Sequence, residues 1–150
     1  MSLARAKAEQ ILRKHRVYRP FSLLSLDCVL WCEGITVCDF PRSMPVREFR
    51  VGNVIGVRSD LDAAWRLWET AHGLGHFLLH AGDQTDGAGS LDNRRQERQA
   101  DEFAGWLLVG RRGLLLPPWE AAESYGVPEE KLRTWLTIVG ARFSSMRRDA

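Results

Sequence analysis

Three histidines recur at intervals of four residues in the stretch ETAHGLGHFLLH, residues 69–80. On an α-helix, side chains four residues apart project from one face, one turn from each other. Two imidazoles in this arrangement can reach a single tetrahedral zinc ion, as in the H-E-x-x-H pattern. His72 and His76 are therefore candidate zinc ligands, provided that a third ligand comes from elsewhere in the chain.

The residue after the first histidine is Gly73, where a hydrolytic zinc helix carries a glutamate as general base. A positioned base contributes about 10²–10⁴-fold to the rate of such a reaction, and glycine offers none. Glycine also costs about 1 kcal/mol of helix stability relative to alanine, so helix propensity does not explain it. Three explanations stay open: natural loss of hydrolysis with a retained partner-binding surface, which we favour, an introduced inactivating change, or weak residual hydrolysis.

Two further residues of this helix could contribute to the site. Glu69 lies one turn before Gly73 and could approach the reacting water only through a second water; a surface acid near a helix start is the more usual role. His80 continues the histidine face but falls at the helix end, where packing or pairing with the helix dipole explains it.

A second helix supplies the missing ligand type in the segment ERQADEFA, residues 97–104. Glu97 and Asp101 are four residues apart and share one face. A carboxylate is a standard third zinc ligand, and a second acid one turn on can accept a hydrogen bond from a ligand histidine. We predict that Glu97 is the third ligand and that Asp101 accepts a hydrogen bond from a ligand histidine. The alternative is that these acids form a partly exposed ion pair.

Together these two segments resemble the ImmA/IrrE family of zinc metallopeptidases. That family carries AHELGH, then about twenty residues later ExxADxFA and two leucines; this chain has AHGLGH (71–76), ERQADEFA (97–104) and Leu107-Leu108. The resemblance covers roughly residues 30 to 110 and fits short members found in phages and mobile elements. It implies zinc bound by His72, His76 and Glu97, with Gly73 at the position of the catalytic glutamate.

The resemblance also implies a partner. Members of the family typically cleave a helix-turn-helix repressor, which relieves repression. Because Gly73 removes the base, we expect a metallopeptidase-fold protein that recognises such a repressor or a similar regulator with impaired or lost hydrolysis. An active zinc endopeptidase, or a non-catalytic antirepressor, toxin–antitoxin or DNA-associated module, is the alternative. Gly73→Glu is expected to raise proteolysis about tenfold or more if the rest of the site is intact.

Hydrophobic periodicity and turn residues predict an α+β fold: a small three-stranded sheet packed on helices, zincin-like, with C-terminal helices. The chain is expected to be a single domain, 1–150, with the sheet and both metal-site helices in 1–110 and a helical extension in 111–150. The expected elements are helices over 2–16, 22–31, about 60–81, 94–109 and two short ones within 120–139, a strand over 35–40, a hairpin over 46–59, and a polar loop over 82–93.

Composition limits the classes of function. The chain has 150 residues, 45% of them hydrophobic, and a net charge of +2, which indicates neither a nucleic-acid nor a membrane partner. It has no apolar run of about 18 residues and no signal-peptide pattern, so a cytoplasmic protein is expected. Residues 121–136 resemble a helix-turn-helix in pattern, but acids begin the second helix, which favours a structural role. Cys28, Cys32 and Cys38 are expected to be reduced, buried thiols.

Overall fold

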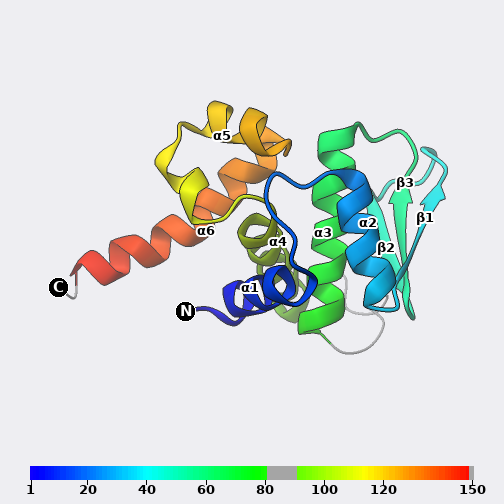
Figure 1. Ribbon diagram of the computed structural model, residues 1–150, viewed down its shortest axis with the longest axis horizontal. Coiled ribbons are helices and arrows are strands. Elements are labelled where there is room, and N and C mark those ends of the chain that lie inside the picture. Colours follow the sequence, from blue (N-terminus) through cyan, green and yellow to red (C-terminus); the bar gives the residue numbers. More distant parts are fainter. Residues whose placement is uncertain (81–90, 149–150) are drawn as a thin grey trace.

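The computed structural model describes residues 1–80 and 91–148. Figure 1 shows a small sheet at one side of the molecule, with helices packed beside it and extending away from it. The α+β class and the three-stranded sheet predicted from the sequence are confirmed. The elements are α1 (Leu3–His15), α2 (Leu23–Cys32), β1 (Thr36–Phe40), β2 (Glu48–Val51), β3 (Val54–Arg58), α3 (Ala63–Leu79), α4 (Leu91–Leu108), the 3₁₀ helix η1 (Arg111–Leu115), α5 (Pro118–Tyr125) and α6 (Glu129–Arg148).

The sheet has the strand order β1-β3-β2. Strands β2 and β3 form the predicted antiparallel hairpin, in which Gly52 adopts the positive φ of 58° that such a tight turn requires. Strand β1 pairs with β3 in parallel. The central strand buries Ile55 and Val57, whereas β2 lies at an edge of the sheet. Among the strands of residues 1–80 and 91–148, therefore, none pairs with the outer side of β2.

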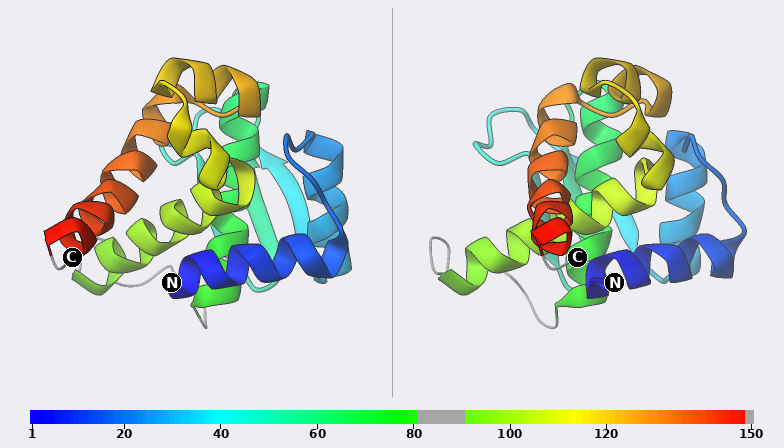
Figure 2. Two further views of the ribbon diagram at one scale, coloured as in Figure 1. Left: turned by 60° about the vertical axis from the view of Figure 1, so that its left-hand side comes forward. Right: turned by 90° about the vertical axis from the view of Figure 1, so that its left-hand side faces the viewer.

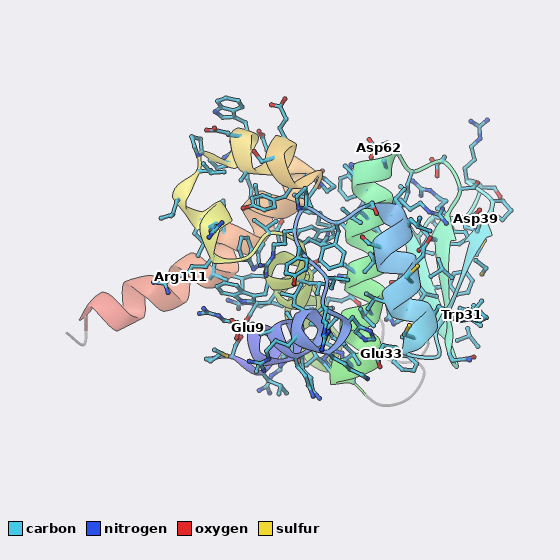
Figure 3. The ribbon with its side chains drawn as sticks, in the orientation of Figure 1. Glu9, Trp31, Glu33, Asp39, Asp62 and Arg111 are labelled. Carbon is cyan, nitrogen blue, oxygen red and sulfur yellow. The ribbon has the colours of Figure 1, made fainter. Side chains whose placement is uncertain are left out.

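Helix α3 is the central element of the fold. It begins at Asp62, whose carboxylate accepts a hydrogen bond of 2.9 Å from the backbone N–H of Trp65; Asp62 is labelled in Figure 3. Figures 1 and 2 show α3 between the sheet and α4. Every residue from Leu67 to His76 is buried, because neighbours cover this part of the helix on all sides. His72 and His76 consequently lie inside the protein.

Two glycines allow the helices to approach closely. A Cβ at Gly75 of α3 would lie 2.9 Å from Cδ1 of Phe103 on α4. A Cβ at Gly105 of α4 would overlap the indole ring of Trp135 on α6. Both positions need glycine for space rather than for backbone conformation. They fix how near α4 lies to α3 and how near α6 lies to α4.

Several expectations require correction. All three cysteines are exposed, not buried, since α2 turns Leu26, Val29 and Leu30 to the core and its two cysteines to the outside. Helix α4 begins at Leu91, three residues earlier than predicted, and α6 is much longer than a short helix. Most of the predicted loop over 82–93 falls outside the described residues. Among the residues that are described, no helix is long and apolar enough to cross a membrane.

We predict that Gly105→Ala destabilises the protein by about 1–3 kcal/mol, because its methyl group overpacks the contact with Trp135. Chemical denaturation of the purified chain measures this free energy of unfolding. Gly140→Ala is the matched control on α6, where a Cβ meets nothing within 4 Å. That control should be neutral or stabilising by up to about 1 kcal/mol, as alanine is the better helix former. Equal effects at both positions would contradict the packing argument.

Candidate metal centre

His72 and His76 of α3 and Glu97 of α4 meet at one point. The Nε2 atoms of the two imidazoles are 3.1 Å apart. Oε2 of Glu97 lies 2.9 Å from Nε2 of His72, and its Oε1 lies 2.8 Å from Nε2 of His76. One potential ligand atom from each residue lies within 4.8 Å of the other two. The structure thus brings together the three residues that the sequence singled out as candidate ligands.

The donor set suits zinc. Atoms about 2.0–2.1 Å from a tetrahedral zinc lie roughly 3.3–3.4 Å from one another. The observed separations of 2.8–3.1 Å are a few tenths of an ångström shorter, so small side-chain rotations would admit the ion. Two imidazoles and one carboxylate are also the ligands of many catalytic zinc sites, which keep a fourth position open. The residues therefore fit this metal in both chemistry and spacing.

Asp101 holds His72 from the opposite side of the ring. Its Oδ1 lies 2.8 Å from Nδ1 of His72 and accepts a second hydrogen bond, of 3.0 Å, from the Trp68 indole. Lys131 of α6 reaches Oδ2 at 3.4 Å. A proton on Nδ1 leaves the lone pair of Nε2 directed at Glu97, which is the tautomer a metal needs. Asp101 thus lies where the sequence analysis expected a supporting acid.

His80 contacts the Nδ1 atom of His76, as Asp101 contacts that of His72. The Nδ1 atoms of these two residues are 3.1 Å apart, and Nε2 of His80 lies 2.8 Å from Oε1 of Gln99. Because the amide oxygen only accepts, the Nε2–H of His80 donates to it, and Nδ1 of His80 accepts from His76. The Nε2 atom of His76 is then free to bind a metal. The sequence analysis expected packing or pairing with the helix dipole for His80 and did not predict its contact with His76.

The charges of the three central groups are strongly coupled. Burial opposes a charge on His72, but its hydrogen bonds to Asp101 and Glu97 outweigh burial and raise its pKa to about 10. Burial lowers the pKa of His76 to about 4, against the opposing effect of Glu97. Although burial favours the neutral form of Glu97, its hydrogen bonds to the two histidines hold its pKa well below the usual range. A metal ion would therefore displace one proton, from His72, and meet a neutral His76 and an ionised Glu97.

The side of α3 at Gly73 faces the sheet. A Cβ at this position would lie 2.9 Å from Cγ2 of Ile55 and 3.0 Å from Oε1 of Glu48. Close packing against β2 and β3 thus gives the physical reason for glycine that helix propensity did not. The gain expected from Gly73→Glu now requires Ile55 and Glu48 to move, because their atoms occupy the space that the new side chain would enter.

A cleft opens beside the three central residues. It is bounded on one side by the residues of β2 and the segment before it, and on the other by α3, α4 and the start of α6. Its lining residues are Pro45, Val46, Arg47, Glu48, Phe49, Arg50, Arg58, Glu69, His72, Asn93, Glu97 and Lys131. Acidic and basic side chains both contribute, so the cleft suits a polar chain with a mixed charge pattern better than a small apolar molecule.

Sequence reasoning missed the contributions of the edge strand. Arg50 donates from Nη1 to both carboxylate oxygens of Glu48, at 2.8 and 2.6 Å, and its Nη2 lies 4.0 Å from Oε1 of Glu97. One guanidinium thus lies between a buried acid and the candidate ligand. The alternation of charged and apolar residues in REFRV predicted a strand, but no role for its charged side chains in the site. Its alternate charged positions, Glu48 and Arg50, were the available signal.

The profile of the family described as the IrrE N-terminal-like domain, peptidase M78, matches residues 32–134. This span includes the sheet, α3, α4, α5 and the first part of α6, and all residues of the candidate site. The chain therefore belongs to this family of metallopeptidase-like proteins, which confirms the resemblance stated from the sequence. Neither a curated protein nor a solved structure gave a significant match.

We predict that the purified chain binds one equivalent of zinc, and that His76→Ala or Glu97→Ala reduces zinc binding at least about 100-fold, because two ligands remain. Isothermal titration against a competing chelator measures the affinity. Glu123→Ala removes an exposed carboxylate of α5 and should leave the affinity unchanged. Wild-type affinity in both ligand variants would show that zinc binds elsewhere.

The hydrogen bond from His72 to Asp101 gives a second prediction. Asp101→Asn should weaken zinc binding by about 10–100-fold, since the amide holds the ring less firmly and no longer raises its basicity. The same titration provides the measurement, and circular dichroism checks that the variant is folded. Lys131→Met is the matched control because it removes the other polar partner of Asp101 and keeps the carboxylate. A larger loss in Lys131→Met than in Asp101→Asn would contradict the assignment.

Proposed function

We propose that this protein binds zinc through His72, His76 and Glu97 and uses the adjoining cleft to recognise a protein chain, namely a helix-turn-helix transcriptional regulator. The observation that carries the proposal is the convergence of three donor atoms from two helices at the end of a cleft bordered by an edge strand. When bound, the zinc would polarise a carbonyl oxygen of the chain in the cleft and activate water. Family membership supports the fold and the metal; the partner is our inference.

The edge strand supports recognition of an extended segment. Arg58 donates its backbone N–H to the Arg47 carbonyl at 2.9 Å, so these two residues form a hydrogen-bonded pair of the antiparallel ladder. By the alternation of such a ladder, the backbone groups of Glu48 and Arg50 point away from β3. An extended segment of a partner could pair with them, which would place it along the cleft.

The glycine at position 73 favours binding of a regulator over its rapid cleavage. The family's base position carries glycine, so no side chain of α3 at that position can take a proton from the attacking water. A regulator bound without cleavage would still be kept from its operator, as an antirepressor requires. An active endopeptidase is the second candidate, favoured by one specific observation: the carboxylate of Glu48 next to Gly73.

A direct DNA-binding role has less support. Helix α6 begins with Glu129 and Glu130, which would repel phosphates. Leu132 and Trp135 of the same helix are buried, and Lys131 is directed at Asp101. The first turns of α6 thus serve the core and the candidate metal centre.

We predict that a helix-turn-helix regulator is encoded beside the gene of this protein and that it binds the zinc-loaded chain one to one. Calorimetry measures the binding, and mass spectrometry of the mixture then checks for cleavage. Arg47→Glu should weaken binding about tenfold or more, as it reverses a charge in the cleft. Arg42→Glu is the matched control, being exposed but outside the lining of the cleft. Absence of binding, together with a salt-dependent shift of DNA by the chain alone, would overturn the proposal.

A further inference from the structure

We propose that Glu48, reaching in from the edge strand, is the general base of this site and supplies the carboxylate that residue 73 lacks. The inference rests on the proposed zinc site and deepens the second candidate function, the active endopeptidase, by assigning it a general base. It concerns a residue on β2, 25 positions before Gly73, the helix position at which the family carries the base.

The first observation is one of volume. Oε1 of Glu48 lies 3.0 Å from the place where a Cβ of residue 73 would sit. A glutamate at position 73 would start its side chain at that point, so the carboxylate of Glu48 occupies space next to the missing one. Glycine leaves space beside α3 that Ile55 of β3 and the carboxylate of Glu48 share, so the strand provides the functional group that residue 73 lacks.

The second observation is that Glu48 is buried but still faces the cleft. Its side chain is only 5% exposed, yet it lines the same cleft as His72 and Glu97. Burying a carboxylate is costly unless hydrogen bonds and a counter-charge support it. Arg50 supplies both, and the same guanidinium lies 4.0 Å from the Glu97 carboxylate. Packing alone would be served more simply by an apolar residue at this site.

The environment of Glu48 also suits a proton acceptor. Burial raises its pKa above the ordinary glutamate value, while His72 and Arg50 act in the opposite direction. A carboxylate with a raised pKa is a stronger base than a solvated one, which is the direction general-base catalysis needs. The raised pKa of Glu48 therefore points in the same direction as its position beside Gly73.

Glu69 is the competing acid of the cleft, and the structure distinguishes the two. It lies on α3 one turn before Gly73, and burial raises its pKa as it raises that of Glu48, with His72 and then Lys131 acting in the opposite direction. Of these two neighbours, Lys131 contacts Asp101 on the Nδ1 side of His72, away from the Nε2 atom that faces Glu97. Glu48 instead shares Arg50 with Glu97 and lies beside Gly73 itself.

The reaction balances without any further reagent. Water attacks the carbonyl carbon of a peptide bond in the cleft, and Glu48 accepts one of its protons. The C–N bond then breaks, and Glu48 returns that proton to the leaving nitrogen. The products are a new carboxyl group, which retains the oxygen of the water, and a new amine; Glu48 ends as it began.

A double-mutant cycle tests the position of Glu48 without using activity. The variants are Gly73→Glu, Glu48→Ala and the two combined, each in the full zinc-loaded chain, with thermal unfolding as the readout. Gly73→Glu should lower the unfolding midpoint by several degrees when Glu48 is present, because the two carboxylates collide and repel. Glu48→Ala should relieve the part of that loss that comes from Glu48, whereas the contact of the new side chain with Ile55 remains in both backgrounds. Additive effects would overturn the inference, since they would mean that the two positions do not share space.

Peptide hydrolysis tests whether Glu48 acts as the general base. The probe is a degenerate mixture of internally quenched peptides incubated with the zinc-loaded chain. Glu48→Gln should slow hydrolysis by about 10²-fold or more with zinc binding unchanged, and Gly73→Glu combined with Glu48→Ala should recover most of it. Glu123→Gln, on exposed α5, is the control expected to match the wild type. Glu69→Gln should slow hydrolysis less than Glu48→Gln.

The outcomes separate this inference from the proposed function. If the wild-type chain binds zinc and its regulator but hydrolyses nothing, or if Glu48→Gln hydrolyses at the wild-type rate, the inference is wrong and the binding function stands. A larger loss in Glu69→Gln than in Glu48→Gln would assign the base to α3 instead. If the wild-type chain binds no zinc, the proposed function and this inference fail together.

Discussion

The contact between α3 and α4 is the constraint on which the rest of the structure depends. Two imidazoles one turn apart can come from any helix, but the third ligand atom must lie roughly 3.3–3.4 Å from both. Gly75 permits α4 to approach so closely that Phe103 packs where a Cβ would be. With that distance fixed, Glu97 meets both histidines and Asp101, one turn further on, meets the back of the His72 ring. A wider spacing would separate the ligands and leave buried polar groups unpaired.

Around this contact the fold provides a layer of support that is mostly polar. Each candidate ligand histidine is held at its Nδ1 atom, one by Asp101 and the other by His80. Helix α6 adds Lys131 to the first of these partners, so a C-terminal element also contributes to the centre. The edge strand adds a guanidinium that connects Glu48 with Glu97. The sheet, α3, α4 and α6 therefore all contribute side chains to the site, and all of these residues lie within the span that matches the family.

Local patterns in the sequence predicted much of this arrangement. The spacing of His72 and His76, and of Glu97 and Asp101, follows from helical periodicity, and a hairpin around Gly52 follows from turn chemistry. The residues from β2 could not be anticipated in this way. Whether Glu48 lies near Gly73 depends on how the sheet packs against α3, and no periodicity within either segment contains that information. The exposed cysteines were mispredicted for a related reason: an apolar segment does not reveal which of its faces turns inward.

X-ray absorption spectroscopy at the zinc edge tests the central claim most directly, because it reports which atoms surround the metal in the folded chain. Coordination by His72, His76 and Glu97 predicts nitrogen and oxygen neighbours at about 2.0–2.1 Å, with the outer scattering of two imidazole rings. Loss of one imidazole is expected in His76→Ala. Sulfur neighbours at about 2.3 Å would instead place the zinc on the exposed cysteines of α2 and β1 and contradict the account.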